Sequence, residues 1–168
     1  IKNVDIYVTG SNAKFLSSDI ITEFRGRGDQ IHLSPLSFKE FFDACQLEYE
    51  DAWNEYSMFG GMPYLLMCKT DEQKISYLNN LFTETYIKDI VNKNNLKNID
   101  VLEDILNIIS SSIGSLTNPN KLSNTFKSIK NQTIAPNTIN QYLEYCVDSF
   151  LIRKAYRYDV KGRKYIDT

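Results

Sequence analysis

The chain carries a polar stretch at the end of its first predicted strand, in Thr9, Gly10, Ser11 and Asn12. The alternating apolar pattern of Val4–Val8 predicts the strand, and Gly10 permits a sharp turn after it. Hydroxyl and amide side chains at a strand end can position a water molecule or a phosphate oxygen. The same residue types also form turns and cap helices, and from the pattern alone the turn and cap are the stronger interpretation.

A basic stretch, RKAYRYDVKGRK at 153–164, is the second place where side chains could do chemistry. Its tyrosines alternate with basic residues, and Lys161–Gly162 predicts a hairpin turn. Such a hairpin could hold the phosphates of duplex DNA, or it could pack on another domain. The candidate phosphate-binding residues are Arg153, Lys154, Arg157, Lys161, Arg163 and Lys164. Two acids in the preceding helix, Glu144 and Asp148, repel phosphate, so both interpretations stay open.

Other chemistries find little support in the 168 residues. The single His32 and three cysteines without a CxxC pair cannot make a standard zinc site, and a cofactor is not expected in this chain alone. We expect the cysteines to be buried packing residues in a reduced, cytoplasmic protein. The net charge of -2 and pI of about 5.5 argue against whole-chain attraction to nucleic acid. The sequence contains no apolar run that approaches the roughly 20 residues of a membrane-spanning helix.

The first 34 residues read as strand, helix, strand. A helix is predicted over Ala13–Phe24 and a second strand over Gln30–Leu33, after the glycine-rich RGRG. This order predicts parallel strands joined by a right-handed crossover. Two strands alone cannot form a stable parallel sheet, because such sheets are buried on both faces. We therefore expect the chain to be part of a longer protein, consistent with its first residue being Ile1.

From Pro35 onward the pattern is helical. Ser37 and Glu40 have the spacing of a capping box, and Gly60–Pro63 predicts a break between two helices. Apolar residues from Ile75 to Ile90 then follow one face of a long amphipathic helix. The predicted domain boundary lies near Leu96–Asp100.

The last third predicts three helices followed by a hairpin, which is the order of a winged helix. The helices are expected over Val101–Ile113, Asn120–Ile129 and Thr138–Leu151. In a winged helix, the third helix enters the major groove while the wing contacts phosphates.

In this order of motifs the chain resembles a group of predicted bacterial and archaeal ATPases of the AAA+ class, whose core (AAA_14) is followed by a domain of unknown function, DUF4143. The resemblance spans nearly the whole chain. It rests on DIYVTGSNAKFLSS at 5–18, RGRGDQIHLSPLSFKEFF at 25–42, FGGMPYL at 59–65, YIKDI at 86–90, IGSL at 113–116 and the stretch from Thr138 to Ile166.

The resemblance implies a mainly α fold with a small β part, in three segments. Residues 1–34 would be the end of an α/β ATPase core, residues 35–97 a helical lid, and residues 98–168 a DUF4143-like winged-helix domain. The family's P-loop, GxxxxGK[ST], and its Walker B acids do not occur in this chain. ATP and Mg²⁺ are therefore implied only for the intact protein, and this chain alone is expected to be noncatalytic.

The resemblance also implies roles for particular residues. Thr9, Ser11 and Asn12 occupy the sensor-1 position that contacts a γ-phosphate, although Ser11 or Asn12 could act only as a cap. Arg27 is a candidate arginine finger, with a solvated surface arginine as the equal alternative. The implied partners are an upstream ATPase core, a downstream nuclease-like domain and, in an oligomer, further copies of the chain. Two alternative functions remain: a winged-helix nucleic-acid-binding module, and a protein-interaction adaptor acting through the helical lid.

Overall fold

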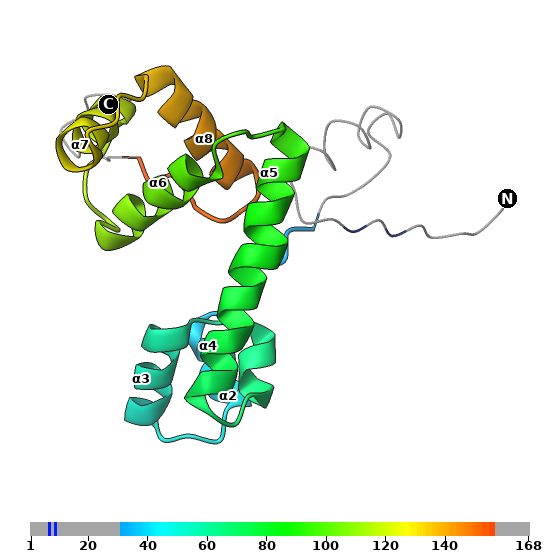
Figure 1. The fold of residues 1–168 in the computed structure, drawn as a ribbon. Coiled ribbons are helices and arrows are strands. Elements are labelled where there is room, and N and C mark those ends of the chain that lie inside the picture. Colours follow the sequence, from blue (N-terminus) through cyan, green and yellow to red (C-terminus); the bar gives the residue numbers. More distant parts are fainter. Residues whose placement is uncertain (1–6, 8, 10–30, 157–168) are drawn as a thin grey trace, which may run out of the picture. The chain divides into compact units, whose positions relative to one another are not determined.

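The computed structural model describes residues 7, 9 and 31–156, and these residues are mainly helical (Figure 1). The chain divides into two compact units, at residues 27–89 and at residues 1–26 with 90–168. We call the first the aromatic unit and the second the three-helix unit. None of the helices in the described part is long and apolar enough to cross a membrane.

The aromatic unit begins with two short helices, α2 (Phe38–Ala44) and α3 (Tyr49–Phe59), which pack against each other. The predicted capping box is confirmed, because the Ser37 hydroxyl accepts from the Glu40 backbone while the Glu40 carboxylate accepts from the Ser37 N–H at 2.8 Å. The Ser37 hydroxyl also donates to the Glu40 carboxylate at 2.7 Å, and this bond, together with the one from the Ser37 N–H, holds the pKa of Glu40 below its ordinary value. The cap satisfies backbone donors that the first turn of a helix leaves free.

Replacing Ser37 with Ala should lower the free energy of unfolding by about 1 kcal/mol, because it removes the hydroxyl that accepts from the Glu40 backbone N–H and donates to the Glu40 carboxylate, and leaves only the bond from the Ser37 N–H. Denaturant unfolding followed by the fluorescence of the single tryptophan, Trp53, measures the effect. Ser57→Ala is the matched control, since the Ser57 hydroxyl donates only to the Asn54 carbonyl within α3. Equal losses in the two variants would contradict a capping role.

The predicted break at Gly60–Pro63 is also confirmed. Gly60 ends α3 with φ of 80° and ψ of −167°, a conformation that essentially only glycine adopts. Pro63 starts a 3₁₀ helix, η1 (Pro63–Met67). The chain is then helical throughout Asp71–Asn94, as α4 (Asp71–Asn80), a π-helical segment η2 (Leu81–Ile87) and α5 (Lys88–Asn94). The long helix expected over Ile75–Ile90 is therefore present, with an unexpected π-helical centre.

The described part of the three-helix unit contains α6 (Ile99–Ser111), α7 (Pro119–Lys130) and α8 (Pro136–Asp148). All three predicted helices are confirmed, each starting one or two residues earlier than expected. Their apolar stripes supply the core, in which Leu102, Ile105, Phe126, Ile139 and Cys146 are almost fully buried. The predicted hairpin at Lys161–Gly162 lies outside the described residues, so the winged-helix assignment stays a prediction.

The second predicted strand is wrong over its described part. Ile31–Leu33 is irregular, and the described residues contain no strand. Ile31 and Leu33 are 79% and 87% exposed, so neither side chain lies in a core. A strand is stable only when a neighbouring strand pairs with its backbone, and no described residue does so here. The first predicted strand and the helix over Ala13–Phe24 fall outside the described residues, apart from Tyr7.

Candidate functional site

The residues expected to sense a nucleotide are mostly beyond what the structure describes. Thr9 is described and exposed. Ser11, Asn12 and Arg27 lie outside the described residues, so the structure does not test whether these side chains come together. Their roles remain predictions.

Of the basic C-terminal residues, only Arg153 and Lys154 are described, and both are exposed. The ammonium of Lys154 forms an ion pair with Glu144 of α8. Glu144, one of the two acids that argue against phosphate binding, therefore neutralises Lys154, one of the candidate phosphate-binding residues. Arg157, Lys161, Arg163 and Lys164 lie outside the described residues.

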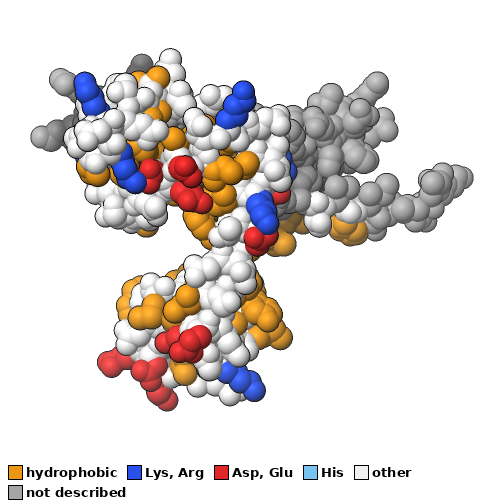
Figure 2. Space-filling view, viewed as in Figure 1, with side chains coloured by type: hydrophobic (Ala, Val, Ile, Leu, Met, Phe, Trp, Pro, Cys, Tyr) orange, Lys and Arg blue, Asp and Glu red, His pale blue; other side chains and the backbone are white. Residues whose placement is uncertain are grey.

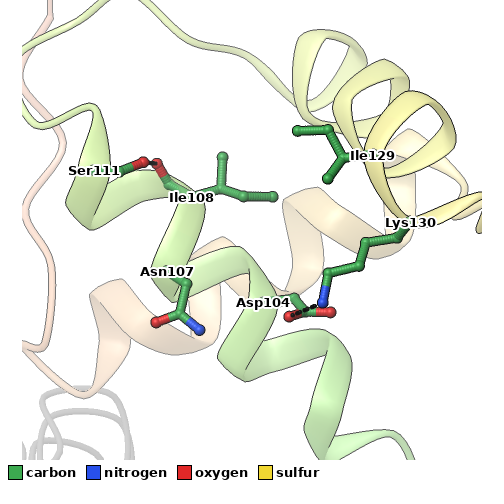
Figure 3. A pocket seen from close by; sticks show the side chains of 6 residues that line it. All are labelled: Asp104, Asn107, Ile108, Ser111, Ile129 and Lys130. Carbon is green, nitrogen blue, oxygen red and sulfur yellow. Dashed lines mark hydrogen bonds and ion pairs between the residues drawn. The ribbon is translucent and has the colours of Figure 1, made fainter.

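A hollow of about 260 Å³ lies between α6 and α7 (Figure 3). Across it, Lys130 reaches from the end of α7 to Asp104 of α6, with 3.0 Å between its Nζ and the carboxylate. Ile108 and Ile129 line the opposite part of the hollow. The single cation and the single carboxylate neutralise each other, so this hollow offers a ligand little charge. We interpret the ion pair between Lys130 and Asp104 as a contact that holds α6 and α7 together.

A second, larger hollow lies on the aromatic unit, between η1 and α4. The ring of Tyr64 packs against that of Tyr77, with centroids 4.8 Å apart. Burial raises the pKa of Tyr77 above its ordinary value. The thiol of Cys68 donates to the Tyr64 carbonyl at 3.7 Å. No general base is paired with a nucleophile in this hollow, so its geometry does not indicate covalent catalysis.

The most enclosed charged group in the described residues is one that sequence reasoning missed. Lys74 of α4 is 8% exposed, forms an ion pair with Glu55 of α3, and lies 3.1 Å from the carboxylate of Asp71. Its ammonium also lies 4.8 Å from the centre of the Phe59 ring. The spacing of Asp71 and Lys74 is a helical i, i+3 pair that the sequence shows, but Glu55 is distant in the chain. The two carboxylates compensate the charge of this mostly buried ammonium.

The described residues contain no group of histidine, cysteine, aspartate and glutamate side chains that could hold a metal ion. They also include no phosphate-binding loop, and the sequence has none. The expectation that ATP and Mg²⁺ belong to the intact protein, and not to this chain alone, stays a prediction.

The structure corrects the expectation that all three cysteines are buried. All three are free thiols, as expected, but only Cys146 is buried, while Cys45 and Cys68 are half-buried beside exposed turns. Burial raises the pKa of the Cys146 thiol to about 12.

At pH 8 the native protein should therefore react with a thiol-specific alkylating reagent at Cys45 and Cys68 and spare Cys146, since the thiolate is the nucleophile. Peptide mass spectrometry after a short exposure measures the sites, and the denatured protein should be modified at all three. Modification of native Cys146 as fast as of Cys68 would contradict the buried, protonated thiol.

Comparison with known protein families shows which family the chain belongs to. Residues 50–168 match the family DUF8612, a domain of unknown function, and the chain belongs to this family. Residues 1–42 match the AAA domain family AAA_14, so the N-terminal part is related to AAA-type ATPases. The resemblance to AAA_14 is thus supported over residues 1–42, whereas the family shown over residues 50–168 is DUF8612, and the DUF4143 assignment stays a prediction.

Two curated relatives are uncharacterized proteins. One, from Haemophilus influenzae, is 34% identical over 99% of this chain and 42% of its own length. The other, from Methanocaldococcus jannaschii, is 28% identical over 88% of this chain and 36% of its own length. The chain therefore spans about two fifths of the length of these relatives. No solved structure matches the chain.

Proposed function

We propose that this chain is the C-terminal part of the nucleotide-responsive module of an AAA+-like ATPase. Residues 35–97 would form its helical lid and residues 98–168 a winged-helix domain, and together they would couple nucleotide state to a partner. The observation that carries the proposal is the match of residues 1–42 to the AAA domain, because this range includes every candidate nucleotide-contacting residue. The greater length of the relatives leaves room for a P-loop elsewhere in such a protein.

In this proposal Thr9, Ser11 or Asn12 senses the γ-phosphate, and Arg27 stabilises the charge that develops during phosphoryl transfer. An arginine suits the second role because its planar guanidinium donates two parallel hydrogen bonds to phosphate oxygens. ATP and Mg²⁺ would be held chiefly by residues outside this chain.

Steady-state ATP hydrolysis by the full-length protein tests these roles. Arg27→Ala should lower turnover by at least about 1000-fold while ATP still binds, since arginine fingers contribute on the order of 10³ to 10⁵ in rate. Asn12→Ala should also lower turnover. The matched control is Lys39→Ala, which removes an exposed cation from α2. A full-length protein that neither binds nor hydrolyses ATP would end the proposal, and unchanged turnover in both site variants would end the residue assignments.

A second candidate function is a winged-helix module that binds nucleic acid. It is favoured by the confirmed order of α6, α7 and α8 and by the exposed Arg153. Binding to duplex DNA should then weaken steeply with salt and be lost when Arg157, Lys161 and Arg163 are neutralised together. Absence of binding at low salt would exclude this function.

A further inference from the structure

The aromatic unit has an exposed face, formed where the α2–α3 loop enters α3. Leu47, Tyr49 and Trp53 are 44%, 61% and 50% exposed there. Glu48, Glu50 and Asp51 surround them in the chain and are also exposed. We call these six residues the acidic aromatic face. Figure 2 shows acidic side chains gathered at the edge of this unit that α3 occupies in Figure 1.

The rings of Tyr49 and Trp53 are held in place by aromatic side chains of α2. Trp53 and Tyr49 both pack edge-on against Phe38 of α2, with ring centroids 4.9 and 5.5 Å apart. Tyr49 also contacts Phe42 at 5.6 Å. Each ring is thus fixed on one side and open to solvent on the other. A pre-positioned aromatic surface loses little conformational entropy when a partner covers it.

Among the described residues, no cation neutralises the carboxylates of the face. No ion pair joins Glu48, Glu50 or Asp51 to a basic side chain in the part of the chain that the structure describes. Helix α3 contains no lysine or arginine, and Lys39 is the single basic residue of α2. Acids in a first helical turn are stabilised by the helix dipole, which accounts for their presence there. It does not account for half-exposed tryptophan and tyrosine rings beside them.

We propose that the acidic aromatic face is a docking surface for a basic, arginine-bearing segment of a polypeptide. Arginine fits both halves of the face, because its guanidinium stacks on an indole or phenol ring while its N–H groups donate to carboxylates. Leu47 supplies apolar area for the aliphatic part of such a segment. Negative charge makes the face unsuitable for nucleic acid. The proposal does not depend on the ATPase assignment.

Fluorescence of Trp53 provides a direct measurement, since it is the single tryptophan of the chain. The probe is a synthetic peptide with the sequence IRKAYRYDVKGRK, the basic stretch at 152–164, which contains no tryptophan. At low salt, we expect a saturable change in Trp53 emission with a dissociation constant on the order of 100 µM, and weaker binding as salt rises. A peptide with glutamine at every arginine and lysine position should not bind.

The variant Glu50→Gln with Asp51→Asn should bind the basic peptide about tenfold more weakly, which corresponds to two exposed charge contacts. The matched control is Asp100→Asn with Glu103→Gln, which removes the same charge from exposed residues of α6 and should bind normally. Circular dichroism checks that both variants keep their helices. The proposal is overturned if Trp53 emission does not change, if the glutamine peptide binds equally well, or if both double variants weaken binding alike.

Discussion

Replacing Gly61 with Ala should lower the free energy of unfolding of the aromatic unit by about 3 kcal/mol or more, the range of severe overpacking. A Cβ at this position would lie 2.0 Å from the carbonyl oxygen of Leu36 and 3.0 Å from the ring of Tyr56. The first of these neighbours is backbone and cannot rotate away. It is also fixed by hydrogen bonds, because Leu36 donates to the Gly61 carbonyl at 2.7 Å and accepts from the Tyr56 hydroxyl at 2.9 Å.

Denaturant unfolding followed by Trp53 fluorescence reports this loss, since Trp53 lies in α3 of the same unit. The control is Gly114→Ala, in the other unit, whose unfolding is followed by far-UV circular dichroism because Trp53 lies in the aromatic unit. Gly114 has φ of 79° but nothing within 4 Å of an added Cβ, so only backbone strain of about 1–2 kcal/mol is expected there. If Gly61→Ala costs no more than Gly114→Ala, the close approach between residues 36 and 61 is not a constraint on the fold.

The second large effect is expected at the buried lysine. Glu55→Gln should lower the free energy of unfolding by about 2 kcal/mol, because it leaves the ammonium of Lys74 in a mostly buried position with Asp71 as its remaining carboxylate partner. Lys74→Met should change it by less than about 1 kcal/mol, since methionine keeps an unbranched apolar chain beside Phe59 and removes the charge. Adding Lys74→Met to Glu55→Gln should therefore recover most of the loss. Failure of that recovery would show that Glu55 acts through something other than Lys74.

The pH dependence of this pair has a definite sign. Burial of the ammonium lowers its pKa, but the hydrogen bonds to Glu55 and Asp71 outweigh burial and raise the pKa of Lys74 above its ordinary value of 10.5. A pKa raised by folding stabilises the protein fully below the unfolded value, and this contribution is lost as pH rises through the folded value. The free energy of unfolding of the wild type minus that of Lys74→Met should thus stay constant from about pH 6 to 9 and fall above about pH 10.5. A change between pH 6 and 9 would contradict the assignment.

Much of the helical structure could be predicted because its determinants are local in the sequence. Ser37 and Glu40 are three residues apart, and their capping box forms as expected. The apolar spacing within α8 likewise predicts which face is buried, including Ile139 and Cys146. The strand over Gln30–Leu33 could not be judged in this way, since a strand depends on a pairing partner that its own residues do not specify.

The same distinction between local determinants and contacts with distant residues applies to the rest of the structure. The sequence by itself determined the helices, their caps, the glycine break and the absence of a phosphate-binding loop, because these depend on neighbours within a few residues. Only the tertiary structure decided that Gly61 must admit the backbone of Leu36, that Glu55 pairs with Lys74, and that Trp53 stays half exposed on a support of Phe38. These contacts join residues from 15 to 25 positions apart in the numbering, and packing between elements, rather than the pattern within any one of them, brings such residues together.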